Sequence, residues 1–181
     1  VSGYSDLVKR ARELGLDSMY FKNINDREVV LKLKELDLDY LFVIGLSQLV
    51  GEEIRSSAKK GVIGFHPTAL PEGRGRAPVA WLTLLQIDGA ATLFFIDRGI
   101  DSGDIIAQVP FTVVEEDDAG SVMEKALSAL VTAIEKIAPD IKAGKLKGVP
   151  QDHEKATYFG KRTTEDGIID WSRSAREIDR L

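Results

Sequence analysis

Two residues have side chains suited to proton transfer and stand where strands are expected to end. His66 follows the apolar run at residues 62–65 and opens a loop bounded by proline. Asp101 lies in the acidic loop DRGIDSGD, which follows a second apolar run at residues 91–96. Ligands bind at strand ends in open α/β sheets, and a parallel sheet would bring these two loops together. A histidine that faces an aspartate at such a place is suited to general-base chemistry.

Each of these residues also has a purely structural interpretation. His66 could only hydrogen-bond the backbone of its loop, and Asp101 could only cap the turn that follows it. A metal site is not indicated, because the second histidine, His153, has no further ligand at suitable spacing and is expected at the surface. The sequence has no cysteine, which excludes disulfides, thiolate metal sites and a cysteine nucleophile.

The elements that would position these residues alternate between helix and strand patterns. This alternation predicts an α/β fold with a mostly parallel open sheet and helices on both faces. Such a sheet normally begins with a strand, whereas this sequence begins with a helical pattern, so a first βαβ unit of about 30 residues is expected to be missing. Strands are predicted at residues 40–44, 62–65, 91–96 and 105–114, with weaker ones at 19–21 and 158–159; helices are predicted at 5–14, 25–36, 77–85 and 118–138, before 61, and from 174.

Composition limits the partners of the protein. The 181 residues are 44% apolar, enough for one core, and carry a net charge of -5 with a pI near 5.2. A protein that must grip a phosphate backbone unaided is therefore disfavoured. No apolar run approaches membrane length and the start is not of signal type, so a soluble cytoplasmic protein is the expectation.

Three motifs in residues 61–104 resemble the signature of the 10-formyltetrahydrofolate-dependent formyltransferases. They read HPTALP from His66, RGRAP from Arg74 and GIDSGD from Gly99. The resemblance runs from about residue 14 to the end and includes ATYFGKRTTEDGIIDW, which is similar to the segment leading out of the catalytic domain in methionyl-tRNA and sugar formyltransferases. It implies a Rossmann-like catalytic domain over residues 1–150, N-terminally incomplete. Residues 151–181 would be a traversing loop and the start of a linker helix towards a C-terminal domain.

The resemblance also implies a set of site residues. The family has an Asn, a His and an Asp at its centre, and His66 and Asp101 match the last two. N10-formyltetrahydrofolate is the implied co-substrate, no metal is implied, and Arg76 and Thr68 are the implied substrate-binding residues. The walls of the implied pterin pocket are Ser47, Gln48, Leu49 and Val50 on one side, and Asp97, Gly99 and Ile100 on the other.

Gly64 departs from the family pattern, because it stands where the family has its Asn. Removal of one oxyanion donor costs roughly 10²- to 10³-fold in rate in other enzymes. Either Thr68 or a backbone N–H at Gly64 replaces that donor, or activity is weak or lost. The glycine could also let a ligand approach the strand closely.

The expected acceptor is the amine of an amino-sugar nucleotide, because RGRAP followed by Trp81 is more similar to the sugar-nucleotide type. Arg74 could help to bind such an anion or form a structural ion pair in its loop. Methionyl-tRNA formyltransferase is the alternative, which the acidic charge disfavours. A hydrolase that releases formate, and a binding module inactivated through Gly64, also stay open, as does the oligomeric state.

Overall fold

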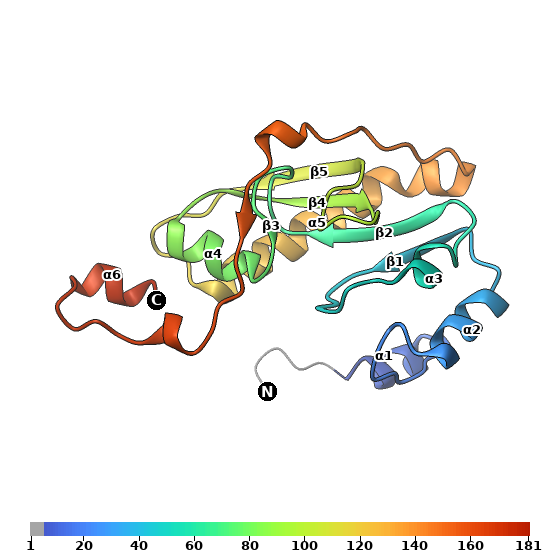
Figure 1. The fold of residues 1–181 in the computed structure, drawn as a ribbon, viewed down its shortest axis with the longest axis horizontal. Coiled ribbons are helices and arrows are strands. Elements are labelled where there is room, and N and C mark those ends of the chain that lie inside the picture. Colours follow the sequence, from blue (N-terminus) through green and yellow to red (C-terminus); the bar gives the residue numbers. More distant parts are fainter. Residues whose placement is uncertain (1–5) are drawn as a thin grey trace.

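The computed structural model describes residues 6–181, and its centre is a four-stranded sheet in the order β1-β2-β4-β5 (Figure 1). A separate two-stranded sheet joins β3 to β6, which lie far apart in the sequence. The strands are β1 Tyr40–Val43, β2 Gly61–His66, β3 Arg74–Gly75, β4 Gly89–Phe95, β5 Ile105–Phe111 and β6 Tyr158–Phe159. The helices are α1 Leu7–Glu13, α2 Arg27–Glu35, α3 Glu52–Arg55, α4 Pro78–Leu85, α5 Ala119–Ala143 and α6 Ala175–Asp179, with 3-10 turns at His153–Lys155 and Glu165–Gly167.

The predicted α/β class is confirmed, but the strand directions differ from the expectation in the second half of the sheet. β1 and β2 are parallel, whereas β2 with β4 and β4 with β5 are antiparallel. The link over residues 96–104 is too short for a parallel crossover, which needs a dozen or more residues. The longer link between β2 and β4 contains α4, which packs through Leu82 against Val113 and Val122. The chain therefore reverses at α4 instead of crossing a face of the sheet.

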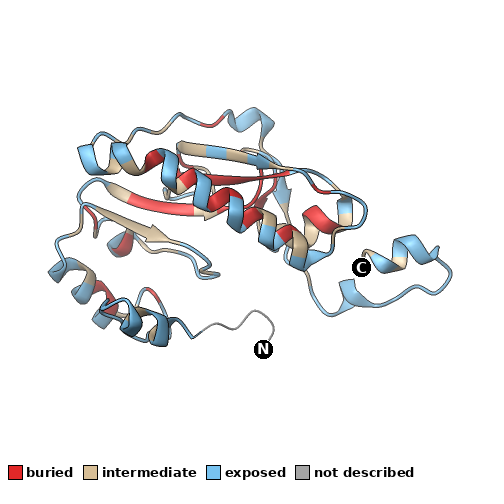
Figure 2. Cartoon of the chain, turned by 180° about the vertical axis from the view of Figure 1, so that it is seen from behind, coloured by how far each residue is buried: buried red, intermediate tan, exposed pale blue. Residues whose placement is uncertain are grey.

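Helices cover both faces of the sheet, as predicted. On one face Val29 and Val30 of α2 pack with Ile54 of α3, and Leu41 of β1 lies against them. Figure 2 shows the other face, where the buried side of α5 lies along the central strands. The buried cluster on that side is Ile63, Ala91, Leu93, Ala129, Leu130, Ala133 and Ile137.

Helix α5 begins where its cap was predicted and continues past the residue that was expected to end or kink it. The Asp118 side chain accepts a hydrogen bond from the Ser121 N–H, and the Ser121 hydroxyl returns one to the Asp118 backbone. Pro139 lacks the N–H for one helical hydrogen bond, yet the helix runs on until Gly144 closes it in a left-handed conformation. Ile137 and Ile141 pack on the core around the proline, and this burial explains why the helix persists.

The segment after α5 returns along the sheet before it leaves the body. Val149 bridges to Ile105, and the following residues bring β6 against β3. Beyond β6 the chain extends away to α6, which begins at Ser174 with the predicted capping box to Glu177 (Figure 1). Residues 19–21, predicted as a weak strand, form no strand. Among the described residues no helix has the length and apolar character needed to cross a membrane.

Candidate functional site

His66 is the last residue of β2, and its ring is almost fully enclosed, with 6% of the residue exposed. Its Nε2 lies 2.9 Å from the carbonyl oxygen of Gly73. A carbonyl can only accept, so the network assigns the ring proton to Nε2 and leaves Nδ1 as an acceptor in the neutral ring. Nδ1 lies 3.6 Å from the Asp101 carboxylate. The unprotonated nitrogen of His66 is therefore the one that faces the aspartate.

Asp101 is held by contacts at both its backbone and its carboxylate. Its φ is +49°, a left-handed conformation that is uncommon for a residue other than glycine. The carboxylate accepts a hydrogen bond of 2.9 Å from the N–H of Gly75. Within the same loop, the Asp97 carboxylate accepts from the Gly99 N–H and the Ser102 hydroxyl. The loop after β4 thus folds back towards His66, which is how an antiparallel pair achieves the convergence expected from a parallel sheet.

A cavity of about 240 Å³ lies beside this pair. Most of the residues implied as pterin-pocket walls line it, with Ser47 outside the lining. The amide of Gln48 is bound to the segment before α2, because it accepts from the Ile24 N–H and donates to the Lys22 carbonyl. The lining residues named in advance are Gln48, Leu49, Val50, Asp97, Gly99, Ile100 and Asp101.

Arginine side chains give this cavity a basic margin. Arg55 lines it and donates hydrogen bonds to the Val50 carbonyl at 2.7 Å and to the Glu52 carboxylate at 2.7 Å. Arg98 also lines the cavity and lies 3.4 Å from the same carboxylate. The hydrogen bond from Arg55, and then the charge of Arg98, hold the pKa of Glu52 below its ordinary value. Glu52 therefore stays ionised, and the mobile, exposed Arg98 keeps its donors available to an anionic ligand.

The space where a side chain at Gly64 would begin is already occupied. A Cβ at this position would lie 2.9 Å from Cζ of Phe94 and 3.1 Å from Cγ1 of Ile96. Both side chains line the cavity together with Gly64. The aromatic ring of Phe94 therefore fills part of the volume in which the family's Asn would stand.

Both groups expected to replace the Asn as donors are engaged elsewhere. Gly64 lies in a central strand opposite Phe94, and the Ile96 N–H donates to the Val62 carbonyl. Hydrogen-bonded pairs alternate in antiparallel strands, so Gly64 and Phe94 form the next such pair. The Thr68 hydroxyl donates to the Glu72 carbonyl at 2.8 Å, and only 2% of the residue is exposed. Thr68 thus shapes the turn after β2, which corrects its expected place in the substrate site.

The remaining implied substrate residue, Arg76, is exposed and follows β3 directly. Its N–H donates to the Phe159 carbonyl. Phe159 stacks on Trp81 with ring centroids 5.9 Å apart, and the Arg162 guanidinium lies over the other ring at 5.6 Å. Arg76 therefore stands next to an aromatic and cationic surface.

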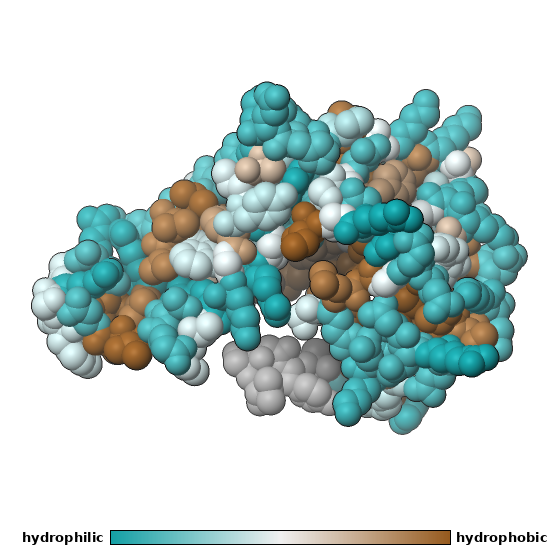
Figure 3. Space-filling model, viewed as in Figure 1, coloured by the Kyte–Doolittle hydropathy of each residue, from teal (hydrophilic) through white to brown (hydrophobic). Residues whose placement is uncertain are grey.

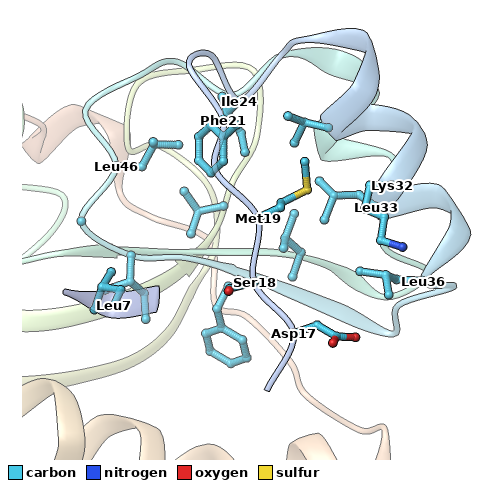
Figure 4. A pocket seen from close by; sticks show the side chains of 16 residues that line it. Leu7, Asp17, Ser18, Met19, Phe21, Ile24, Lys32, Leu33, Leu36 and Leu46 are labelled. Carbon is cyan, nitrogen blue, oxygen red and sulfur yellow. The ribbon is translucent and has the colours of Figure 1, made fainter. Parts of the chain in front are cut away.

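A larger cavity of about 760 Å³ lies away from His66 and Asp101, neither of which lines it (Figure 4). Residues 41–44 all line it, which places it along the edge of β1 that has no partner strand within residues 6–181. Apolar side chains from α2 and the segment before it supply most of the remaining wall, and Asp17, Ser18 and Lys32 are its polar members. The space-filling view shows apolar side chains beside this part of the chain (Figure 3).

A family model described as formyl transferase matches residues 8–136. The chain belongs to the formyl transferase family. The match covers the strands that carry His66, Gly64 and Asp101, and it places this geometry within the family domain.

Solved structures of formyltransferases share the fold. HypX from Aquifex aeolicus in complex with tetrahydrofolic acid has a TM-score of 0.75 and 18% identity, over 84% of this chain and 27% of that one. The formyltransferase PseJ from Anoxybacillus kamchatkensis, in complex with UDP-4,6-dideoxy-4-formamido-L-AltNAc and tetrahydrofolate, has a TM-score of 0.68 and 23% identity, over 86% and 81%. Methionyl-tRNA formyltransferase from Clostridium thermocellum has a TM-score of 0.71 and 23% identity, over 95% and 72%.

Sequence reasoning missed a buried polar cluster behind the formyl transferase site. Arg74 was expected either to bind an anion or to form an ion pair, but its partners are neutral: Gln151, Tyr158 and His153. Gln151 lies in the segment interpreted as a traversing loop, which has no periodic pattern. Only the resemblance of the block that follows could have drawn attention to it.

Proposed function

We propose that this protein transfers a formyl group from N10-formyltetrahydrofolate to an amine. The observation that carries the proposal is the His66–Asp101 pair, 3.6 Å apart, beside a cavity lined by the two loops implied to hold the pterin. Leu49 and Ile100 supply apolar surface on opposite walls for a flat ring system, and the Arg98 guanidinium stands at the margin for the acidic tail of a folate. Both folate-bound relatives named above share this fold.

The geometry of the pair suits proton acceptance from an attacking amine. Nδ1 of neutral His66 and the Asp101 carboxylate are two acceptors that face one another, and an N–H donor or a water can lie between them. The amine nitrogen forms a bond to the formyl carbon, and the bond from that carbon to N10 of the folate breaks. The amine proton passes to His66, directly or through water. Protonated Nδ1 then forms an ion pair with Asp101, and that proton is available for the departing nitrogen.

The proposed acceptor is an amino-sugar nucleotide. Arg76 is exposed next to the stacked Trp81 and Phe159, and a guanidinium pairs well with phosphate oxygens. The chain itself carries a net charge of -5, which disfavours transfer RNA as the acceptor unless another part of the protein binds it.

A specific observation favours one second candidate, a folate-binding module with little turnover. Neither the Thr68 hydroxyl nor the Gly64 backbone is available as an oxyanion donor, and Phe94 makes the wall at this place apolar. In this case the cavity would bind folate while the chemical step stays slow.

The test measures formyl transfer by the purified protein with 10-formyltetrahydrofolate and a panel of amino-sugar nucleotides, with mass spectrometry of the acceptor. Charged initiator methionyl-tRNA is the second acceptor, and a reaction without amine reports formate release. A formylated sugar nucleotide, lost in His66→Ala, supports the proposal. A formylated tRNA alone overturns the acceptor assignment, and formate release without any amine identifies a hydrolase. Tetrahydrofolate binding by calorimetry without any product identifies the binding module.

A further inference from the structure

The buried cluster behind the site contains a charge without a counter-charge. Only 2% of Arg74 is exposed, and its guanidinium donates to the Gln151 side-chain oxygen through both Nε, at 3.2 Å, and an Nη, at 2.6 Å. It also contacts the Tyr158 hydroxyl and Nδ1 of His153, each at 3.1 Å. A charge buried in this way is costly unless it is well hydrogen-bonded. The four contacts hold Arg74 and give Gln151 a fixed partner.

The amide of Gln151 connects this charge to the Asp101 loop. Its nitrogen donates to the Asp101 carbonyl at 2.9 Å and to the Gly103 carbonyl at 2.7 Å, while its oxygen accepts from Arg74. A guanidinium can only donate and a carbonyl can only accept. One orientation of the amide satisfies both ends, so Arg74 dictates that the amide nitrogen faces the loop.

These contacts fall on the backbone that carries the uncommon φ of +49° at Asp101. Such conformations cost free energy and persist when the surroundings over-determine them. Gln151 holds the carbonyl of Asp101, and Gly75, the neighbour of Arg74 in β3, holds its carboxylate. Both contacts therefore come from the cluster around Arg74.

We propose that Gln151 is a positioning residue that fixes Asp101 beside His66, and that Arg74 fixes Gln151. Gln151 does not line the cavity and touches no reacting atom. Its role in catalysis rests on the proposed formyl transfer, whereas its role in placing the carboxylate does not.

The substitution Gln151→Glu separates positioning from a structural role. Glutamate keeps the length of the side chain and the acceptor for Arg74, to which it adds an ion pair, but it cannot donate to the two carbonyls. We expect the fold to persist and the Asp101 loop to move. Displacement of a reacting group by about 1 Å can cost about 100-fold in rate, so we expect kcat to fall about 10- to 100-fold, with KM for the formyl donor changed less than about threefold.

The N–H of Gly75 gives a readout that needs no activity, because it donates to the Asp101 carboxylate. In Gln151→Glu and Gln151→Ala, hydrogen exchange of this amide, followed by NMR, should accelerate at least about tenfold. Tyr158→Phe is the matched control, since it removes an Arg74 contact on the side away from Asp101 and should leave both kcat and the exchange rate unchanged.

The two readouts distinguish the failure of each proposal. Wild-type exchange at Gly75 in Gln151→Glu, with an unchanged kcat, would overturn the positioning role and leave formyl transfer standing. If the wild-type protein transfers no formyl group, the proposed function fails, and exchange at Gly75 alone decides whether Gln151 places Asp101. Should Gln151→Ala fail to fold, the comparison of Gln151→Glu with Tyr158→Phe still decides.

Discussion

The two cavities differ in size and in chemistry, and the smaller one carries the groups that can react. The larger, of about 760 Å³, follows the free edge of β1 and is mostly apolar. The smaller, of about 240 Å³, brings together an aspartate, arginines and an apolar wall next to His66. Volume alone would select the wrong place for the chemistry. Convergent polar groups at a strand end are the more informative signal.

The largest expected effect tests whether the smaller cavity is the catalytic one. His66→Ala removes the nitrogen that faces Asp101, and general-base groups contribute about 10²- to 10⁴-fold to rates. We therefore expect formyl transfer to fall about 1,000-fold in steady-state assays. His153→Gln is the matched control, because it replaces the second histidine while keeping an acceptor for Arg74. An equal loss in both variants would disconnect catalysis from His66.

A second prediction concerns the apolar wall of the smaller cavity. Gly64→Asn forces the Phe94 ring to move, and such overpacking costs about 1–3 kcal/mol in the free energy of unfolding. We expect urea denaturation to show this loss, and Gly64→Asn with Phe94→Leu to recover part of it. Formyl transfer should be faster in the double variant than in Gly64→Asn alone. Full stability of Gly64→Asn would show that the ring does not fill this volume.

A third prediction uses a pair of substitutions, one in each cavity. Leu41→Ala in the larger cavity removes packing against α2 and α3, so it should lower stability by about 1–2 kcal/mol with kcat unchanged. Ile100→Ala in the smaller cavity affects a half-exposed residue, so it should raise KM for the formyl donor several-fold with little loss of stability. Urea denaturation and kinetics check both. The opposite pattern would exchange the roles of the two cavities.

The smallest effect is expected at a site that lines neither cavity. A hydrogen bond from Lys125, followed by those from the Val114 N–H and the Ser121 hydroxyl, lowers the pKa of Asp117 from 3.8 to about 2. Its ionised form is favoured in the folded state, so this contribution to stability is complete above about pH 4 and is lost as the pH falls towards 2. Asp117→Asn should remove this part of the pH dependence in acid denaturation. Formyl transfer at neutral pH should stay unchanged.

The sequence by itself determined the local features. Unbroken apolar runs placed β2 and β4, because a strand buried on both faces needs apolar residues at every position. The cap at Asp118 and the spacing of apolar residues placed α5, since both signals lie within a few residues of the structure they specify. His66 and Asp101 could be named because each directly follows such a run, and the family resemblance joined them.

The tertiary structure alone decided how distant parts meet. Strand direction depends on where α4 packs, so the reversal of β4 has no local pattern in the sequence. The contact of Gln151 with the Asp101 carbonyl spans 50 residues in the chain and joins a segment without periodicity to the site. The filling of the space at Gly64 by Phe94 is likewise a cross-strand contact. Such contacts follow from packing and hydrogen-bond satisfaction across the whole fold, which local propensity does not encode.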